Sequence, residues 1–320
     1  MLPATSRHDN AAQRFDIEWK NARKSIAEQC GDDELATLDA KVAEIDHGEG
    51  EAVIVIRAAS GPTLIEFLDE PVDHMVAERA ALPRLVTLLE ARQRTVAHLV
   101  VETDRAGADL IAFDGGDVLA AEQVDGETLH IHRGHPGGWS QRRFQQRAEN
   151  TWERNAGDVA DAVAAMAVEV DAQLIAVAGD VRAQAMVLEA LPHDMAERAI
   201  KIDAGSPGGV ADEVVRAVSN LVAERVRGLA DQLRTALSAG TASIEVDDTL
   251  AALVGGRVDT LLVHDDGSDG PTLAHDLAGI PVGVRVVDAA VVQALRTDAH
   301  IVVTPRLAVM SGPIAALLRW

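Results

Sequence analysis

Arginines gather over a short stretch near the middle of the chain. Arg142, Arg143, Arg147 and Arg154 fall close together, whereas the chain as a whole has a formal net charge of -22. Guanidinium groups bind phosphates through paired N–H donors, and a local basic face on an acidic protein favours such ligands. The arginines therefore predict a docking face for phosphates, such as those of a nucleic-acid backbone.

A predicted loop comes directly before these arginines. Pro136 removes an amide donor, and Gly137 and Gly138 permit backbone angles that other residues avoid. The pattern then changes to a helix, for which Ser140 is the predicted N-cap. Further residues of the loop are expected to assist phosphate contact, the histidines when partly charged; they are His132, Arg133 and His135. On composition alone, a solvated helix after a surface loop remains an alternative.

Other polar residues invite a metal or acid–base interpretation. Spacings of two and three residues among His130, His132 and His135 define no tetrahedral site in a glycine-rich loop, and the one cysteine, Cys30, does not join them. Asp104, Asp114 and Asp117 each lie at a predicted turn, where aspartate bonds to the backbone. We therefore expect no metal and no cofactor.

Length and composition limit the class of protein. A chain of 320 residues with 48% hydrophobic residues is long enough for two or three globular domains. A single cysteine excludes an internal disulfide. Residues 1–24 lack the apolar core of a signal peptide, and no apolar run has the length that spans a bilayer. We expect a cytoplasmic protein with no membrane or DNA partner.

Hydrophobic periodicity predicts a mixed α/β fold with three domains, over residues 1–92, 93–209 and 210–320. The first domain should begin directly on a helix, without a first strand. It is predicted to hold helices over 12–30 and 35–45 and a hairpin of strands over 52–57 and 63–68.

The second domain is predicted to hold a meander of strands over 96–101, 108–113 and 118–124, then the loop and arginine helix, a strand over 174–178 and a helix ending at 191. The third is predicted to hold a long helix over 214–239, a helix ending at 255 with Asp247 or Asp248 as its cap, and a strand over 258–263.

The loop and helix resemble a signature of the archaeal and eukaryotic class-one release factors. In that family a small basic loop ends in Gly-Gly-Gln-Ser and continues into a helix with spaced Arg, Phe and Arg. Matching positions here are held by Gly137, Gly138, Ser140, Arg143, Phe144 and Arg147. Trp139 stands at the position of the family's catalytic glutamine.

The resemblance extends in one collinear order over residues 93–320. The meander, the 174–179 strand and the Val-x-Thr-Leu-Leu strand at 258–262 are similar to the second and third domains of release factors and Pelota. Residues 312–320 resemble Pelota's closing strand. The third domain would then be an α/β/α domain like ribosomal proteins that bind kinked RNA. Within the bacterial branch, the chain resembles the hibernation factors of the Balon group and their mycobacterial relatives.

This resemblance implies a three-domain factor that binds the ribosomal A site and large-subunit RNA, with an elongation-factor GTPase as a candidate partner. No codon-reading loop of the release factors is recognisable in residues 1–92, so stop-codon reading is not expected. Two function classes stay open. One is a non-catalytic ribosome-binding factor for hibernation or rescue, because an indole cannot hold water as the glutamine does. The other is a peptidyl-tRNA hydrolase that uses the displaced Gln141.

Overall fold

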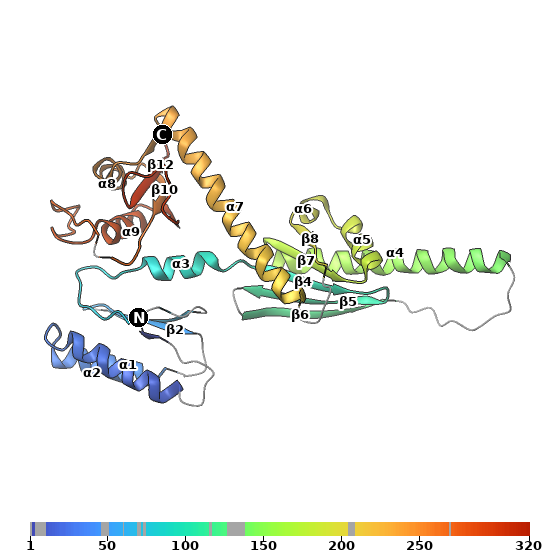
Figure 1. Cartoon of the computed structure of the whole chain (residues 1–320), viewed down its shortest axis with the longest axis horizontal. Helices are drawn as coiled ribbons and strands as arrows, with labels where there is room; N and C mark the ends of the chain where they lie inside the picture. The colour runs from blue at the N-terminus through green and yellow to red at the C-terminus, as the bar shows by residue number, and fades with distance from the viewer. Residues whose placement is uncertain are drawn as a thin grey trace. The chain divides into compact units, whose positions relative to one another are not determined.

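The structure is a computed structural model of the chain. It describes residues 2–3, 11–45, 51–59, 61–68, 72, 75–114, 117–126, 138–203, 209–268 and 270–320. The described residues form a mixed α/β fold with three separate sheets (Figure 1). Their contacts group the chain into two compact units, Met1–Gln93 with Val226–Trp320, and Arg94–Arg225. The division into three domains remains a prediction.

The N-terminal sheet has the order β1-β2-β3. Its strands are β1 (Leu2–Pro3), β2 (Ala52–Arg57) and β3 (Thr63–Leu68), paired antiparallel throughout. The predicted hairpin is confirmed with the same bounds. The expected lack of a first strand is wrong, because β1 pairs with β2; two residues are too few to give a periodic signal.

Helices cover both faces of this N-terminal sheet. On one face, α1 (Ala11–Ile26) and α2 (Asp32–Val42) bury Phe15 and Val42 against Val53 of β2. On the other face, α3 (Val86–Arg94) buries Leu88 against Ile54. The alternation of Val53 and Ile54 between the two faces follows the two-residue period of a strand.

The sheet of the second unit has the order β6-β5-β4-β7-β8. Its strands are β4 (His98–Thr103), β5 (Gly107–Asp114), β6 (Asp117–Asp125), β7 (Leu174–Gly179) and β8 (Ala199–Lys201). β4, β5 and β6 form the predicted antiparallel meander, and β7 and β8 add to it in parallel. The carboxyl ends of β4 and β7 therefore lie beside each other, with Thr103 in register with Gly179.

Three helices pack on one face of this sheet. They are α4 (Gly138–Glu169), α5 (Val181–Ala190) and the short α6 (His193–Ala196). From α4, Val159 and Val163 are fully buried against Leu99 and Val177. The other face is covered by Val214 from the first half of α7 (Gly209–Ala239).

The C-terminal sheet has the order β11-β10-β12-β9. Its strands are β9 (Ala242–Ser243), β10 (Val258–Val263), β11 (His300–Val303) and β12 (Ile314–Leu318). Leu261 faces α8 (Val246–Val254) and α9 (Val286–Arg296), whereas Leu262 faces Leu233 from the second half of α7. The result is the expected α/β/α layering of this part of the chain.

Within the first unit, α3 also packs on the core of the C-terminal sheet. Leu85 and Leu89 join the cluster that contains Leu253 and Leu261. The side-chain amide of Gln93 makes two hydrogen bonds with edge strand β11. Its Nε2 donates to the Ile301 carbonyl at 2.7 Å, and its Oε1 accepts from the Val303 N–H at 2.7 Å. Gln93 thus pairs with β11 as a neighbouring strand would.

A buried ion network lies at the start of α9. Arg285 bonds Asp265 through Nη2 at 2.5 Å, and its Nη1 lies 3.4 Å from both carboxylate oxygens of Asp288. Asp288 is buried, and burial raises the pKa of its carboxyl to about 6 despite the attraction of Arg285. Arg84, paired with Glu78 at 2.6 Å, belongs to the same electrostatic environment.

Within the described part of the chain, no helix has the length and apolar character needed to cross a membrane.

Candidate functional site

The arginine-rich segment occupies the first turns of α4. This helix begins at Gly138, so Gly138 and Trp139 belong to helical backbone rather than to the loop expected from the sequence. The prediction of Ser140 as N-cap is wrong, because Ser140 lies two residues inside the helix. Gln141, Arg142, Arg143 and Arg147 share the same helical backbone. The predicted contacts of His132, Arg133, His135 and Gly137 lie outside the described residues.

Helix α4 has two parts, one that packs on the sheet and one that extends beyond it. Its 32 residues span about 48 Å at about 1.5 Å per residue. Residues after Asn155 pack on the sheet, and Figure 1 shows the first turns continuing past the ends of the strands. We call residues 138–148 the arm. The direction of the arm is therefore set where α4 reaches the sheet, over residues 149–155.

At that point, two arginines stack on one indole. The guanidinium carbon of Arg105 lies 4.7 Å from the ring centroid of Trp152, and that of Arg182 lies 5.3 Å from it. Trp152 comes from α4, Arg105 from the turn after β4, and Arg182 from the first turn of α5. Cation–π contacts of this kind favour a fixed guanidinium orientation. We call the three residues the Arg–Trp–Arg stack.

Two carboxylates contact the Arg–Trp–Arg stack. Arg182 Nη2 donates to Glu149 Oε1 at 2.7 Å, and Arg105 Nη2 donates to Asp180 Oδ2 at 3.3 Å. Half of each arginine side chain is exposed, with a relative accessibility of 50% for Arg105 and for Arg182. Exposed ion pairs contribute little to stability, so the stack remains open to other anions.

Asp180 is held mainly by the backbone of α5. Its Oδ1 accepts from the N–H groups of Arg182 at 3.0 Å and Ala183 at 3.1 Å, which makes it the N-cap. The bond from Ala183, with support from Arg105, holds the pKa of the Asp180 carboxyl below its ordinary value. The cap therefore stays ionised at neutral pH.

The turn that carries Arg105 is fixed from two sides. Asp104 Oδ1 accepts from the N–H groups of Ala106 at 2.6 Å and Gly107 at 2.9 Å, so the predicted turn role of Asp104 is confirmed. Buried Asn155 of α4 donates from Nδ2 to the Arg105 carbonyl at 3.0 Å. The backbone under the stack is thereby tied to α4.

Two glycines allow the strands and helices to meet at this point. A Cβ on Gly179 would lie 2.0 Å from the Thr103 carbonyl oxygen, and Gly179 has a φ of 111°. A Cβ on Gly126 would lie 2.4 Å from Asn155 Cγ. Only glycine permits these approaches without displacement of the backbone or of Asn155.

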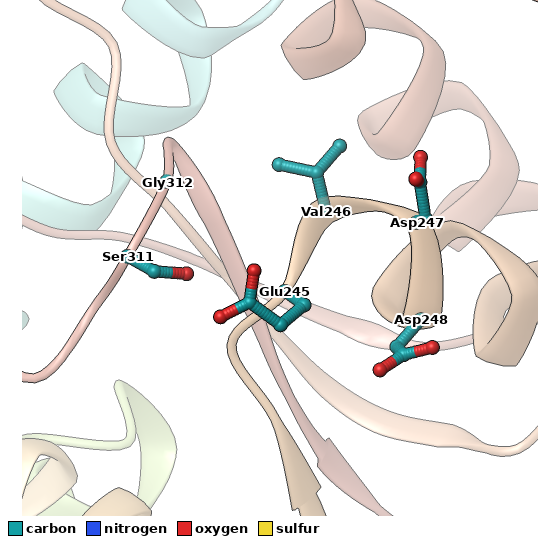
Figure 2. Close-up of a pocket in the computed structure, with 6 residues that line it drawn as sticks. All are labelled: Glu245, Val246, Asp247, Asp248, Ser311 and Gly312. Carbon is teal, nitrogen blue, oxygen red and sulfur yellow. The ribbon is translucent and has the colours of Figure 1, made fainter.

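A hollow with an acidic lining lies at the start of α8. Figure 2 shows Glu245, Asp247 and Asp248 around it, with Ser311 and Gly312 opposite. Its volume is about 360 Å³. Three carboxylates repel phosphates, so this hollow is not a candidate for phosphate binding.

This hollow also corrects a predicted cap. Glu245 is the N-cap of α8 and makes no capping bond with its side chain. Asp247 and Asp248 lie inside the first turn, where the helix dipole favours negative charge without a cap bond. The prediction that one of these two aspartates caps the helix is therefore wrong. Among the described residues, no cluster of His, Cys, Asp or Glu could hold a metal ion.

The arm and the Arg–Trp–Arg stack both lie in the part of the chain that matches a known protein family. Residues 97–239 match the family described as bacterial archaeo-eukaryotic release factor family 2. This segment belongs to the bacterial branch of the release factor superfamily. The matched residues of this release factor-like segment run from β4 to the end of α7.

The chain is also similar to individual proteins. An uncharacterized protein of Mycobacterium tuberculosis, Rv2629 in strain H37Rv, is 26% identical over 273 residues, covering 81% of this chain and 73% of its own. Ribosome-bound archaeal Pelota, solved with ABCE1, has a TM-score of 0.45 at 19% identity, over 71% of this chain and 62% of its own. Saccharomyces cerevisiae Dom34, a translation termination-like factor that interacts with Hbs1, has a TM-score of 0.43 at 11% identity, over 70% and 63%.

The sequence predicts the arginine-rich helix of the arm but not the Arg–Trp–Arg stack. Arg105 and Arg182 lie 47 residues before and 30 residues after Trp152, so no local spacing connects them. The one sequence signal was a tryptophan inside an arginine-rich helix, which periodicity assigns equally well to a core.

Proposed function

We propose that this protein is a ribosome-associated factor that occupies the A site during hibernation or rescue and does not read stop codons. The observation that carries the proposal is the family match over residues 97–239, which includes the whole arginine helix. Archaeal Pelota, to which the chain is similar, is described as ribosome-bound.

The local positive charge of the arm supports ribosomal RNA as the ligand. The formal net charge of the chain is -22, which disfavours general attraction to RNA. Binding then depends on a local basic face, and the arm carries Arg142, Arg143 and Arg147 with Arg154 following in the same helix. In this proposal these arginines contact RNA phosphates, together with His132, Arg133 and His135 from the preceding segment.

Trp139, at the start of the arm, favours occupancy of the ribosome over hydrolysis of peptidyl-tRNA. Hydrolysis in the superfamily depends on the glutamine whose position Trp139 holds here. An indole can stack on a base, a contact worth about 1–3 kcal/mol, whereas it offers one donor and much bulk for holding water. We propose that Gly137 and Gly138 let the backbone approach RNA closely while Trp139 stacks.

A GTPase partner and a cytoplasmic location complete the proposal. Dom34 is described as interacting with Hbs1, and we propose that an elongation-factor GTPase delivers this protein in a comparable way. Ribosome binding in turn requires a cytoplasmic protein.

The test of binding is co-sedimentation with ribosomes from growing and starved cells. The double variant Arg143→Glu with Arg147→Glu should lose co-sedimentation while its far-UV circular dichroism stays unchanged. A matched control reverses two exposed arginines of α7, Arg216→Glu with Arg234→Glu, and should still bind. Equal binding by a folded arm variant would remove the arm from the interface.

The test of chemistry is release of labelled peptide from ribosome-bound peptidyl-tRNA. Trp139→Ala should weaken ribosome binding, and Gln141→Ala should change little. If the wild type releases peptide and Gln141→Ala does not, the protein is a peptidyl-tRNA hydrolase and the proposal of occupancy without hydrolysis fails. Trp139→Gln restores Gly-Gly-Gln-Ser, and a gain of release activity by this variant would indicate that the surrounding segment is still suited to hydrolysis.

A further inference from the structure

We propose that the Arg–Trp–Arg stack of Arg105, Trp152 and Arg182 is a second phosphate-binding surface, which contacts the RNA backbone at the base of the arm. This inference rests on the proposed function and extends it, because two of these residues lie outside the arginine helix. The ligand chemistry is a series of RNA phosphate groups, bound without reading of base sequence.

The geometry supports this assignment because the arginines are already ordered. A flexible arginine loses side-chain entropy when it binds a phosphate, whereas a stacked guanidinium has lost much of it beforehand. Both guanidinium groups stack on Trp152, at 4.7 Å and 5.3 Å. Each side chain is nevertheless half exposed, so the stack orders the arginines without burying them.

The hydrogen bonds of Arg105 and Arg182 also favour a phosphate ligand. A guanidinium carries five N–H donors, and among the described residues each arginine uses one terminal nitrogen on one carboxylate. Asp180 would keep both backbone bonds through Oδ1 if a phosphate took Arg105 from its Oδ2. Glu149 is half exposed and can be hydrated when a phosphate takes Arg182. Neither exchange removes the cap of α5.

The stack is also continuous with the arm. Trp152 lies in the same helix as Arg147 and Arg154, and the other two residues follow the adjacent carboxyl ends of β4 and β7. A backbone that follows the arm toward the sheet would meet Arg105 and Arg182 next. Phosphates recur along RNA at every nucleotide, so an extended row of arginines suits this ligand better than a single anion does.

The experiment compares the salt dependence of binding to purified ribosomes. The variant Arg105→Gln with Arg182→Gln removes two charges at the carboxyl ends of the strands. The control Arg198→Gln with Arg225→Gln removes two charges next to Ala172 and Gln173, before the start of β7. Both variants change the net charge equally, so any difference between them reports position rather than total charge.

We expect the slope of log K against log salt to fall by about two units for the stack variant, roughly one per lost phosphate contact, and to be unchanged for the control. Equal slopes for the stack variant and the wild type overturn the inference, and so does an equal loss in the control. Should the double variant fail to fold, each single variant should lower the slope by about one unit.

A lysine variant separates phosphate contact from simple positioning of the arm. Arg105→Lys with Arg182→Lys keeps both charges and loses the planar stacking. Retention of most of the slope supports contact with phosphates, whereas a loss equal to that of the glutamine variant assigns the stack to arm positioning and overturns the inference. Absence of ribosome binding by the wild type would overturn the proposed function as well, which distinguishes the two failures.

Discussion

The buried carboxyl of Asp288 should make the stability of the C-terminal part depend on pH. Burial raises its pKa from 3.8 to about 6, since Arg285 bonds more closely to Asp265 than to Asp288. The folded state therefore binds this proton more tightly than the unfolded state does. The stabilisation from this group is complete below about pH 4 and is lost as the pH rises through about 6.

The size of the effect follows from the shift. At about 1.4 kcal/mol per pKa unit, the rise to about 6 corresponds to on the order of 3 kcal/mol. Asp288→Asn removes the charge and keeps an oxygen that can accept from Arg285. Above about pH 7 this variant should be more stable than the wild type by up to that amount, and near pH 4 the two should be equal.

The assay is urea unfolding followed by circular dichroism at a series of pH values, read as the difference between variant and wild type. Taking the difference removes the titration of all other carboxyls. A matched control, Asp231→Asn, removes an exposed carboxylate of α7 and should not reproduce the gain in stability above about pH 7. A flat curve for Asp288→Asn, or a variant that is less stable at every pH, would refute this account of the ion network.

Three further predictions concern packing, strand pairing and decoding. Gly126→Ala places a methyl group against Asn155 and should cost about 1–3 kcal/mol in thermal unfolding, whereas Gly157→Ala, with nothing within 4 Å, should stabilise by about 0.5–1 kcal/mol. Gln93→Leu leaves two backbone groups of β11 unpaired and should cost about 1–3 kcal/mol in the same measurement. Ribosome co-sedimentation should be indifferent to the A-site codon, and a clear preference for stop codons would contradict the proposal.

Strands with a strong local pattern were predictable from the sequence. β2, β3 and β10 have the predicted bounds, because each is a run of apolar and β-branched residues between turn residues. β1, β8 and β9 hold two or three residues, too few for any period to be recognised. β1 and β9 pair with strands that come later in the chain, and β8 pairs with β7, the strand before it.

Helix starts were less predictable than helix existence. Ser140 is a residue type that often caps helices, yet α4 begins before it. Helix α8 begins at Val246, with Glu245 as its N-cap, although two aspartates follow. Several residues near a helix start are chemically able to cap, and the path of the preceding chain selects among them. The Arg–Trp–Arg stack was hidden for a related reason, since only the tertiary fold brings its arginines to Trp152.

The pairing of Gln93 with β11 has a consequence for handling parts of this protein. A strand edge with unpaired N–H and C=O groups is a template for other chains, and natural sheets protect such edges against aggregation. Here one glutamine side chain protects part of the edge, and Leu85 and Leu89 cover the adjacent apolar core. Residues 226–320 expressed without residues 82–93 would expose both features together. Such a fragment should associate with itself, whereas one that keeps α3 should remain dispersed.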